Sequence, residues 1–558
     1  IHAQVVVCPG LNDGDALLQT LQEHKPDTII HMAAQTHVDR SFDGPHQFVH
    51  DNISATLTLL ECCREYGGIK RFVHMSTDEV YGDVPTDHTG CVEHTAVLHP
   101  TNPYSASKAG AEHMCTAYRM SYGMPIVMIR CNNVYGPTQY PEKLVPKFTR
   151  LLADGKRCPI QGDGTALRSF VHARDVARAI ALISDKGIIG EAYNIGTANE
   201  FSVRQIFERI LEMVRPGADP EKWCAHVADR PYNDKRYAVD DTKLRALGWC
   251  EEEDFDLGLL ETVRDELRTV SPSSLRWLVY GSRGWIGQQL VALLEAKGHT
   301  VIAGVARADD DDAVARELDT VKPDRVFCLV GRTHGGGCAT IDYLEHPDRL
   351  VENVTDNLYS PLHLALACGK RDIHFSYLGT GCIFSYNDAT PASGYDASAR
   401  PDFFGSNYSI IKGFTDRLMH HVSALNLRIR MPIVGHDSPR NFVTKICTYA
   451  KVVNIPNSMT VLPELLPVAI DLAVCKSTGT VNLTNPGAIS HNEILTMYRD
   501  LVDPTFTWEN FSEAEQNLVI KSKRSNNLLD TARLEKEYPQ VMDIHSSMRK
   551  LFEGWGNK

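Results

Sequence analysis

The chain has 558 residues, of which 43% are hydrophobic and 23% are charged. This length and composition predict a globular protein of several α/β units and exclude a chain dominated by disorder. The 57 basic and 70 acidic residues give a formal net charge of −13, which argues against nucleic acid as a partner. No uninterrupted apolar run reaches the length of about 18 residues that a membrane span needs, so we expect no membrane partner either.

Fifteen cysteines stand at irregular spacing and without CxxC pairs. The odd number and the spacing argue against a disulfide framework and a zinc site, and the 23 histidines show no metal-ligand spacing. We therefore expect no metal site and a reducing, cytoplasmic location. No basic segment with an apolar core follows Ile1, which argues against a secretory signal.

Short apolar runs rich in β-forming residues alternate with helical patterns along the whole chain. This alternation is typical of βαβ units and a parallel sheet. In chain order, we predict a strand at 28–32, a helix at 52–65, a strand at 71–75, a helix at 104–119, a polar linker at 269–275, a strand at 277–280, a helix at 288–296, and strands at 300–305, 325–330 and 373–378.

The chain repeats one design. Lys-Pro-Asp leads into an apolar run at 25–27 and again at 322–324, and Asp-Asn opens a helical pattern at 51–52 and 356–357. In each copy a strand then ends in Ser/Thr, and Tyr-x-x-x-Lys follows 27 or 28 residues later. We therefore predict a first domain at 1–268, a linker at 269–275 and a second domain at 276–558.

The second domain opens with a strand, a glycine-rich turn and a helix, in the order of a dinucleotide-binding fingerprint. The glycines of the turn are Gly281, Gly284 and Gly287, and Trp285 and Ile286 lie between them. Glycine permits a tight turn and close backbone approach, and the helix N-terminus offers N–H groups to a pyrophosphate. The turn therefore predicts a cofactor site.

Two arginines favour NADPH as the cofactor of this domain. Arg283 lies in the glycine turn and Arg307 follows the second strand, where a 2′-phosphate is met in such sites. The run of four acids at 309–312 indicates a solvated loop rather than a metal site.

Tyr-x-x-x-Lys on a helix places both side chains on one face, one turn apart. A nearby ammonium lowers the pKa of the tyrosine and makes it a usable base. Because the pair occurs twice, each time after a strand that ends in Ser/Thr, both halves resemble the extended short-chain dehydrogenase/reductase family. The resemblance implies two tandem Rossmann-like, doubly wound α/β domains, with Tyr104 and Lys108, and Tyr408 and Lys412, as catalytic pairs.

Within residues 27–250 the first half resembles nucleoside-diphosphate-glucose 4,6-dehydratases. The motifs are HMAAQTHVDRS at 31–41, STDEVYG at 76–82, NPYSASK at 102–108 and NNVYGP at 132–137. The resemblance implies that Tyr104 takes the C4 hydroxyl proton as hydride passes to NAD. It implies that Glu79 removes the C5 proton and that Asp78 protonates the departing C6 hydroxyl. Thr77 is implied to hydrogen-bond O4, and Lys108 to hold Tyr104 and the ribose.

The same resemblance implies binding residues in the first half. Those implied for NAD are Ala33, Ala34, Asn52 and Ser76. Those implied for the sugar nucleotide are Thr36, Asn133, Lys143, Leu144, Arg168, Arg230 and Asn233, with Arg236 as a further candidate. For the basic residues among them, the alternative is an ordinary surface charge.

The first half departs from these dehydratases near its start. They place an acidic adenosine contact where this chain has Pro9-Gly10-Leu11. Gly281 lies 43 residues before Asp324, and the matching position in the first copy falls before Ile1. We therefore expect the first domain, as a fragment, to lack its glycine turn and to carry an incomplete NAD site.

Nearly all of 276–558 resembles 4-keto-sugar reductases, and in particular the epimerase/reductase half of UDP-L-rhamnose synthases. The motifs are TGCIF at 380–384, RMP at 430–432, PRNFVTK at 439–445, VNIPNSMTV at 453–461 and RSNN at 524–527. The resemblance implies Cys382 as the acid and Lys445 as the base on opposite faces of the sugar ring. On this reading Cys382 stands where the first half has Asp78.

The resemblance also implies that Tyr408 donates a proton during reduction of the C4 ketone, with Lys412 assisting and NADPH supplying hydride. Arg440 and Asn441 are implied to contact the substrate. For Cys382 the alternative is a small buried apolar residue, and for Lys445 a solvated helix lysine.

Both halves in this order resemble the plant-type UDP-L-rhamnose synthase family. The resemblance implies conversion of UDP-glucose, through UDP-4-keto-6-deoxy sugars, to UDP-β-L-rhamnose, with NAD in the first domain and NADPH in the second. Two alternatives stay open: the same chemistry on dTDP-sugars, and an inactive first half that serves as a binding or dimerisation module. The helices at 52–65 and 104–119 match those that pair subunits in the family, which implies a homodimer.

Overall fold

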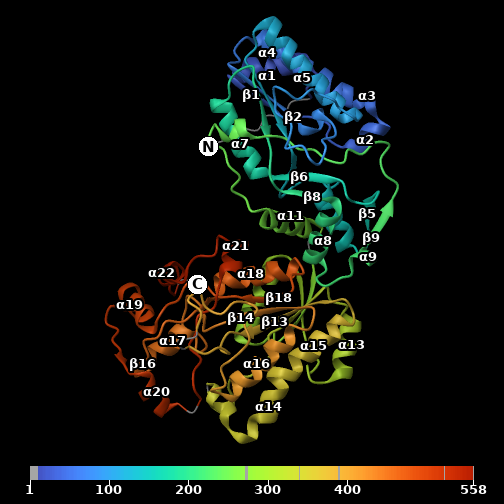
Figure 1. Ribbon diagram of the computed structural model, residues 1–558. Helices are drawn as coiled ribbons and strands as arrows, with labels where there is room; N and C mark the ends of the chain where they lie inside the picture. The colour runs from blue at the N-terminus through green and yellow to red at the C-terminus, as the bar shows by residue number, and fades with distance from the viewer. Residues whose placement is uncertain (1–9, 271–273, 339, 387–389, 521, 557–558) are drawn as a thin grey trace. The chain divides into compact units, whose positions relative to one another are not determined.

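The computed structural model describes residues 10–270, 274–338, 340–386, 390–520 and 522–556. The chain divides into two compact units, Ile1–Leu267 and Arg268–Lys558. Each unit is built around a parallel sheet flanked by helices (Figure 1).

The central sheet of the first unit has four parallel strands in the order β1-β2-β3-β7. They are β1 (Thr28–His31), β2 (Arg71–Thr77), β3 (Ile126–Cys131) and β7 (Ala192–Ile195). On one face, Val73 and Val127 pack against α7 (Ala173–Lys186). On the other, Phe72 and Ile126 pack in a core with three helices: α1 (Gly14–His24), α4 (Ala55–Tyr66) and α5 (Pro103–Tyr122).

The rest of the first unit forms two small sheets and their covering helices. The sheets are β4-β6-β8 and β5-β9. Their strands are β4 (Asn133–Tyr135), β5 (Cys158–Gln161), β6 (Leu167–His172), β8 (Glu200–Ser202) and β9 (Cys224–Val227). The remaining helices are α2 (Val38–Asp43), α3 (Pro45–Phe48), α6 (Leu144–Ala153), α8 (Val203–Val214), α9 (Pro220–Trp223), α10 (Thr242–Arg245) and α11 (Phe255–Val270).

The central sheet of the second unit has six parallel strands in the order β11-β10-β12-β13-β14-β18. They are β10 (Arg276–Tyr280), β11 (Thr300–Ala303), β12 (Arg325–Cys328), β13 (His374–Thr380), β14 (Ala424–Ile429) and β18 (Gly479–Asn482). One face packs against α12 (Trp285–Ala296) and α18 (Leu462–Val474). The other packs against α13 (Asp311–Val321), α15 (Ser360–Gly369) and α16 (Asn407–Met419). Helices thus cover both faces in each unit, and the predicted doubly wound α/β fold is confirmed.

The remaining elements of the second unit are short. The strands are β15 (Pro432–Ile433), β16 (Lys451–Val452), β17 (Thr460–Val461) and β19 (Glu509–Asn510), which pair as β15-β17 and β16-β19. The helices are α14 (Leu350–Val354), α17 (Phe442–Cys447), α19 (His491–Leu501), α20 (Glu513–Val519), α21 (Ala532–Glu537) and α22 (Ile544–Glu553).

The two units repeat the same local structures. Lys25 and Lys322 each end a helix in the left-handed conformation, both with a φ of 48°. A π-helical turn, Val49–Ser54 in one unit and Thr355–Tyr359 in the other, follows the first shared strand. The strands β1, β2, β3 and β7 therefore correspond to β12, β13, β14 and β18. Within residues 10–267 the parallel sheet has no counterpart of β10 and β11.

Some predicted boundaries differ from the observed ones. The linker was predicted to begin at Thr269, but α11 continues to Val270, and 271–273 lie outside the described residues. The acidic run was predicted as a solvated loop, yet Asp310 caps α13 and Asp311 begins it. Carboxylates at a helix start accept backbone N–H groups and complement the helix dipole, which explains this difference.

Candidate active sites

The carboxyl end of β2 holds the predicted acid–base residues of the first unit. β2 ends at Thr77, and a 3₁₀ turn over Asp78–Tyr81 follows directly. The Thr77 hydroxyl accepts from the backbone N–H of Glu79 at 3.3 Å and donates to Oδ1 of Asp78 at 3.1 Å. All three side chains are buried. The strand end therefore presents two neighbouring carboxyl groups away from solvent.

Different elements hold the two carboxyl groups. Asn132 donates from Nδ2 to Oδ2 of Asp78 at 2.7 Å. Burial, and then the charge of Glu79, raise the pKa of Asp78 to about 7, so it can carry a proton near neutral pH. Oε2 of Glu79 accepts from Nδ2 of Asn102 at 3.2 Å and from the Tyr237 hydroxyl at 3.4 Å. Burial also raises the pKa of Glu79.

The predicted pair Tyr104 and Lys108 lies in the first turns of α5, and both side chains are buried. Nζ of Lys108 donates to the main-chain carbonyl of Met75 at 2.6 Å, and burial lowers its pKa to about 8. We expected the ammonium to lower the pKa of Tyr104. Instead, burial and the charge of Glu79 raise it, against a hydrogen bond with Thr77 that lowers it. The Thr77 hydroxyl, and not the Lys108 ammonium, is therefore the group that lowers the pKa of Tyr104.

Three predicted basic residues converge on Glu79. The charges of Arg168 and Arg230 act on Glu79, and Lys143 interacts electrostatically with both Glu79 and Arg230. Nε of Arg230 lies 2.6 Å from Oδ1 of Asp39 in an ion pair. Three cations that act on a buried carboxyl group suit the pyrophosphate of a sugar nucleotide.

Neighbouring residues hold these cations in place. Nζ of Lys143, directly before Leu144 and α6, donates to the carbonyl of Thr36 at 2.6 Å. Arg168 donates to Oδ1 of Asn233 at 2.9 Å. Thr36 and Asn233 therefore lie at the site as predicted, but each contacts a basic side chain.

Asn133 and Arg236, two further residues predicted to bind substrate, differ in whether their polar atoms have hydrogen-bond partners in the fold. Nδ2 of Asn133 is buried, with no hydrogen-bond partner among the described residues, so a bound ligand can satisfy it. Arg236 binds Oε1 of Glu200 at 2.8 Å and the main-chain carbonyls of His88 and Pro85 at 2.8 and 3.1 Å. Nε and Nη1 of Arg236 are therefore used within the fold, and its role in substrate binding stays a prediction.

Of the residues predicted to contact NAD in the first unit, Ala33 and Ala34 follow β1, Ser76 lies near the end of β2, and Asn52 lies in a helical turn between them. Asn52, in the π-helical turn, accepts from the backbone N–H of Gln35 at 2.7 Å and donates to Oγ of Ser107 at 2.8 Å. It thereby holds the loop that contains Ala33 and Ala34. Oγ of Ser76 is buried without a partner in the described chain, which leaves it free for a ligand. These residues fit the nicotinamide end of NAD.

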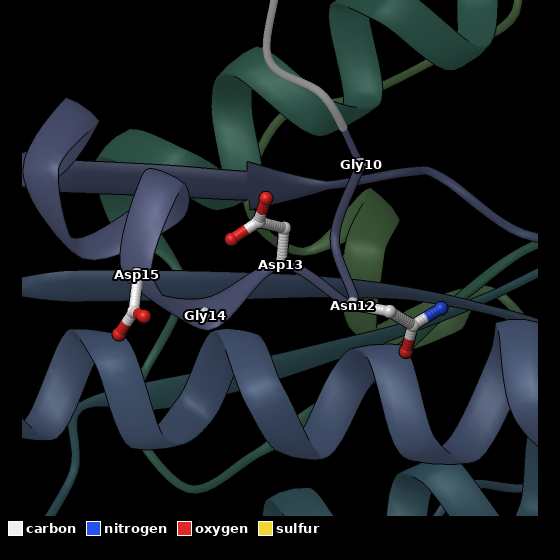
Figure 2. A pocket seen from close by; sticks show the side chains of 5 residues that line it. All are labelled: Gly10, Asn12, Asp13, Gly14 and Asp15. Carbon is white, nitrogen blue, oxygen red and sulfur yellow. The ribbon is translucent and has the colours of Figure 1, made fainter.

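An open pocket of about 700 Å³ lies at the start of α1, lined by Gly10, Asn12, Asp13, Gly14 and Asp15 (Figure 2). Nδ2 of Asn12 lies 3.3 Å from Nδ1 of His50, in the π-helical turn that carries Asn52. Asp13 caps α1 through the N–H of Ala16. The acidic adenosine contact is absent at Gly10, and Pro9 lies outside the described residues.

The carboxyl end of β13 holds Cys382 of the second unit. β13 ends at Thr380, whose hydroxyl accepts from the backbone N–H of Cys382 at 3.1 Å. This is the contact that the threonine of the first unit makes with Glu79. Cys382 therefore corresponds to Glu79, and the prediction that it stands at the position of Asp78 is wrong by one residue.

Tyr408 and Lys412 are buried on α16. Burial raises the pKa of Tyr408, and a hydrogen bond with Thr380 opposes it. Nζ of Lys412 donates to the hydroxyl of Tyr377 at 2.6 Å, and burial lowers the pKa of Lys412 to about 8. The threonine, tyrosine and lysine of the predicted reductase site are thus brought together.

A basic cluster surrounds Lys445, which lies on α17. Arg440 contacts the imidazole of His334, and Arg524 pairs with Oδ2 of Asp342 at 3.1 Å. Burial, followed by the charges of Arg440 and Arg524, lowers the pKa of Lys445. A lowered pKa makes the neutral amine, which can act as a base, more available.

Asn441 was predicted to contact substrate, but its amide makes its hydrogen bonds within the fold. It is fully buried, and its Oδ1 caps α17 through the N–H of Val443 at 3.3 Å. Its Nδ2 donates to the carbonyls of Val434 and His436 at 2.9 and 2.8 Å. Because each polar atom of the amide is used in the fold, the prediction that Asn441 contacts substrate is contradicted, and the residue positions the start of α17.

The glycine turn of the second unit has the geometry of a cofactor cradle. Gly281 has a φ of +82°, and a Cβ on Gly287 would lie 2.2 Å from the carbonyl oxygen of Gly281. α12 starts at Trp285 and Ile286, and its N-cap residue, Gly284, offers no side-chain cap. The first N–H groups of α12 are therefore open to a pyrophosphate, and these residues fit a dinucleotide.

The side chains predicted to meet a 2′-phosphate are exposed. Arg283 lies in the turn, and Arg307 binds both oxygens of Asp309 at 3.0 and 2.9 Å. β11 ends at Ala303, so its last residue brings no carboxylate of the kind that binds the ribose of NAD.

Two family profiles match the chain, one in each half. The profile described as GDP-mannose 4,6 dehydratase matches residues 4–262, and that of the NAD dependent epimerase/dehydratase family matches 277–437. A trifunctional UDP-glucose 4,6-dehydratase/UDP-4-keto-6-deoxy-D-glucose 3,5-epimerase/UDP-4-keto-L-rhamnose-reductase of Arabidopsis thaliana is 40% identical over 94% of this chain and 87% of its own length. The chain belongs to this family of fused UDP-rhamnose synthases. The resemblance stated from the motifs is thereby confirmed.

Other relatives match about half of this synthase family member. The dTDP-glucose 4,6-dehydratase 1 of Escherichia coli (strain K12) is 39% identical over 45% of this chain and 75% of its own length. The solved structure of the L780 UDP-rhamnose synthase from Acanthamoeba polyphaga mimivirus is 51% identical over 50% of this chain and 99% of that chain, with a TM-score of 0.49.

Several site residues of this synthase family member escaped prediction. In the first unit they are Asp39, Asn102, Asn132 and Tyr237, and in the second His334, Asp342, Tyr377 and Arg524. Asp39, Asn102, Asn132 and Arg524 lie in motifs that carried the resemblance, so proximity to the named residues could have indicated them. Tyr377 and Asp342 gave no such signal, because only the fold brings them to the site.

Membrane and metal sites were not expected. Across the described ranges, no helix combines the length and the apolar character that a membrane crossing requires. Across the same ranges, no group of three His, Cys, Asp or Glu side chains is placed to hold a metal ion.

Proposed function

We propose that the chain converts UDP-glucose to UDP-β-L-rhamnose, by 4,6-dehydration in the first unit and by 3,5-epimerisation and 4-keto reduction in the second. The observation that carries the proposal is the pair of buried carboxyl groups, Asp78 and Glu79, at the end of β2. Exchange of hydride at C4 needs only a tyrosine, whereas loss of water across C5 and C6 needs both an acid and a base.

In the first unit, the residues move protons around the sugar. Ala33, Ala34, Asn52 and Ser76 would hold NAD, which would supply the hydride acceptor for C4 and the hydride donor for C6. Tyr104 accepts the C4 hydroxyl proton as the phenolate, which the Lys108 ammonium stabilises. Glu79 removes the C5 proton, which the C4 ketone has made acidic, and protonated Asp78 gives its proton to the C6 hydroxyl, which leaves as water. Glu79 then gives its proton back to C5 as C6 is reduced.

In the second unit, the residues first invert two centres and then protonate O4. At each of C3 and C5 in turn, neutral Lys445 removes the ring proton and the Cys382 thiol returns a proton to the opposite face. Proton exchange with solvent restores the amine and the thiol before the next inversion. The turn of Gly281, Gly284 and Gly287 would hold NADPH, which would supply the hydride for C4. Tyr408 donates its proton to O4, and the Lys412 ammonium stabilises the resulting phenolate.

The division of cofactors and the choice of nucleotide belong to the same proposal. We assign NADPH to the second unit, supported by exposed Arg307 and by the absence of a carboxylate at Ala303, and NAD to the first. We assign the uridine nucleotide because the relative that spans 94% of the chain carries UDP-sugars in its name. The cations Lys143, Arg168 and Arg230 suit its pyrophosphate.

We also propose a homodimer that acts in the cytoplasm. α15 and α16 are the counterparts in the second unit of the helices predicted at 52–65 and 104–119 to pair subunits. They expose Leu366, Phe414 and Leu418 by 48%, 56% and 38%, an apolar face that a second copy can cover. Free thiols suit a reducing compartment, and fourteen described cysteines are free. Sedimentation of wild type and Phe414→Glu tests the dimer, since only the variant should be monomeric, and cell fractionation tests the location.

The activity is tested with UDP-glucose and NAD, first without NADPH. We expect mass spectrometry to detect a product lighter by one water, and added NADPH to convert it to UDP-rhamnose. No loss of water, with turnover of supplied UDP-4-keto-6-deoxyglucose and NADPH, would contradict the dehydratase part alone. Failure of both reactions would reject the proposal, and faster turnover of dTDP-glucose would correct the nucleotide.

A further inference from the structure

The residues beside the catalytic lysine differ between the two units. Strand register pairs His31 with His74 across β1 and β2, and Cys328 with Tyr377 across β12 and β13. All four side chains are buried. Because β1 and β2 correspond to β12 and β13, the two pairs occupy equivalent places.

In the first unit, this pair does not hold the lysine. Neither ring nitrogen of His74 has a hydrogen-bond partner among the described residues. Burial, and then the charge of Lys108, lower the pKa of His74, so the ring is neutral beside the ammonium. Lys108 instead donates to the main-chain carbonyl of Met75 at 2.6 Å.

In the second unit, a side-chain hydroxyl accepts the hydrogen bond from the catalytic lysine. The Tyr377 hydroxyl, on a side chain only 1% exposed, accepts from Nζ of Lys412 at 2.6 Å. Nζ also lies 4.9 Å from the centre of the Tyr377 ring. A Cβ on Gly331 would come within 3.2 Å of the same Nζ. Lys412 is therefore held between β13 and the loop that corresponds to Ala33 and Ala34.

We infer that Tyr377 is a positioning residue of the reductase, whose hydroxyl holds the Lys412 ammonium beside Tyr408 and the cofactor crevice. The inference rests on the proposed function. Reduction leaves Tyr408 as a phenolate after its proton has passed to O4. An ammonium held one helical turn away stabilises that charge better than a mobile one. The first unit uses a main-chain carbonyl for the same purpose, which no side-chain substitution can remove.

The test removes only the hydroxyl, with Tyr377→Phe in the full chain. We expect kcat for reduction of the keto sugar to fall about tenfold, as for loss of a hydrogen bond to a charged group. Dehydration of UDP-glucose by the first unit should be unchanged. So should exchange of the C3 and C5 protons in D2O without NADPH, which Cys382 and Lys445 carry out.

The control is Tyr538→Phe, which removes a buried hydroxyl that donates to Asp471 at 2.8 Å. It should leave all three reactions at the wild-type rate. A merely structural role for Tyr377 would lower exchange and reduction together. Equal reduction by wild type and Tyr377→Phe would overturn the inference.

A crystal structure of the Tyr377→Phe holoenzyme gives a readout besides activity. We expect Nζ of Lys412 to move to the main-chain carbonyl of Leu378, the counterpart of Met75. An unmoved Lys412 would show that Tyr377 does not position it. If wild type itself fails to reduce the keto sugar, the proposed function fails, and the position of Lys412 still decides whether Tyr377 holds it.

Discussion

Nδ2 of Asn132 donates to Oδ2 of Asp78 at 2.7 Å, while Oδ1 of the same carboxyl accepts from Thr77 at 3.1 Å. Asn132 directly follows β3, and Thr77 ends β2. Asn102, the cap of α5, holds the neighbouring Glu79. The proposed acid and base are therefore oriented by three elements of the rigid fold before substrate binds.

The first prediction separates the roles of the two carboxyl groups. Asp78→Asn should lower dehydration at least about hundredfold, because an amide cannot supply the proton that the leaving hydroxyl needs. Exchange of the C5 proton in D2O should persist. Glu79→Gln should lose both exchange and dehydration. Asp154→Asn, an exposed acid of the first unit, is the control, and equal loss of exchange in the two carboxyl variants would contradict these roles.

The second prediction concerns pH. The pKa of Asp78 is raised to about 7, so between about pH 4 and 7 the folded chain binds this proton more strongly than the unfolded chain. Its contribution to stability is therefore present at low pH and is lost as the pH rises through about 7. Asp78→Asn should melt higher than wild type at pH 8, and the difference should shrink at pH 5 in thermal scans. A constant difference would contradict this.

The sequence predicted the fold and the residues that we propose to react, but not the residues that hold them in place. The spacing of Tyr-x-x-x-Lys after a strand indicates residues such as Tyr104 and Tyr408 because neighbouring turns of a helix place them on one face. The role of Tyr377 was not predicted, because the sequence pattern of a strand does not show which catalytic side chain contacts a given strand residue. Asn441 was misassigned because a motif match does not separate a residue that contacts a ligand from one that caps the helix beside it.

The third prediction concerns the buried ion pair of the second unit. Arg428 and Asp416, 0% and 4% exposed, lie 2.7 Å apart. Burial alone would raise the pKa of Asp416, but the hydrogen bonds from Arg428, His420 and Asn426, together with the charge of Arg428, outweigh it and lower the pKa to about 2. Asp416→Asn should cost about 3–5 kcal/mol of unfolding free energy, because it leaves a buried cation unpaired.

Urea unfolding of the full chain measures this cost. The control is Asp319→Asn, whose pair with Arg371 is 2.7 Å long but 64% exposed at the aspartate. It should cost less than about 1 kcal/mol. The contribution of Asp416 should be present above about pH 4 and should fall as the pH drops toward 2. An equal loss of unfolding free energy in the two variants would contradict the expected effect of burial.

The fourth prediction tests the glycine turn. Gly287→Ala should abolish NADPH binding, because its Cβ would lie 2.2 Å from the carbonyl oxygen of Gly281. Gly369→Ala, where no atom lies within 4 Å of the new Cβ, should bind NADPH as wild type does. Fluorescence titration with NADPH measures both. Dehydration by the first unit should continue in each variant, and normal NADPH binding by Gly287→Ala would contradict the cradle.

The last prediction tests how the second unit selects its cofactor. The Arg307 guanidinium binds both oxygens of Asp309 in the free chain, so a 2′-phosphate must compete with that carboxylate. Arg307→Ala should raise the KM for NADPH about tenfold, the scale of one charge-assisted hydrogen-bonded pair, and leave the KM for NADH unchanged. Asp309→Asn should lower the KM for NADPH, since it frees the guanidinium.

Arg316→Ala removes an exposed positive charge on α13 and controls for the loss of net charge. Equal effects of Arg307→Ala on both cofactors, or of Arg316→Ala on NADPH, would assign selection to another residue, because only a contact with the 2′-phosphate distinguishes the two cofactors.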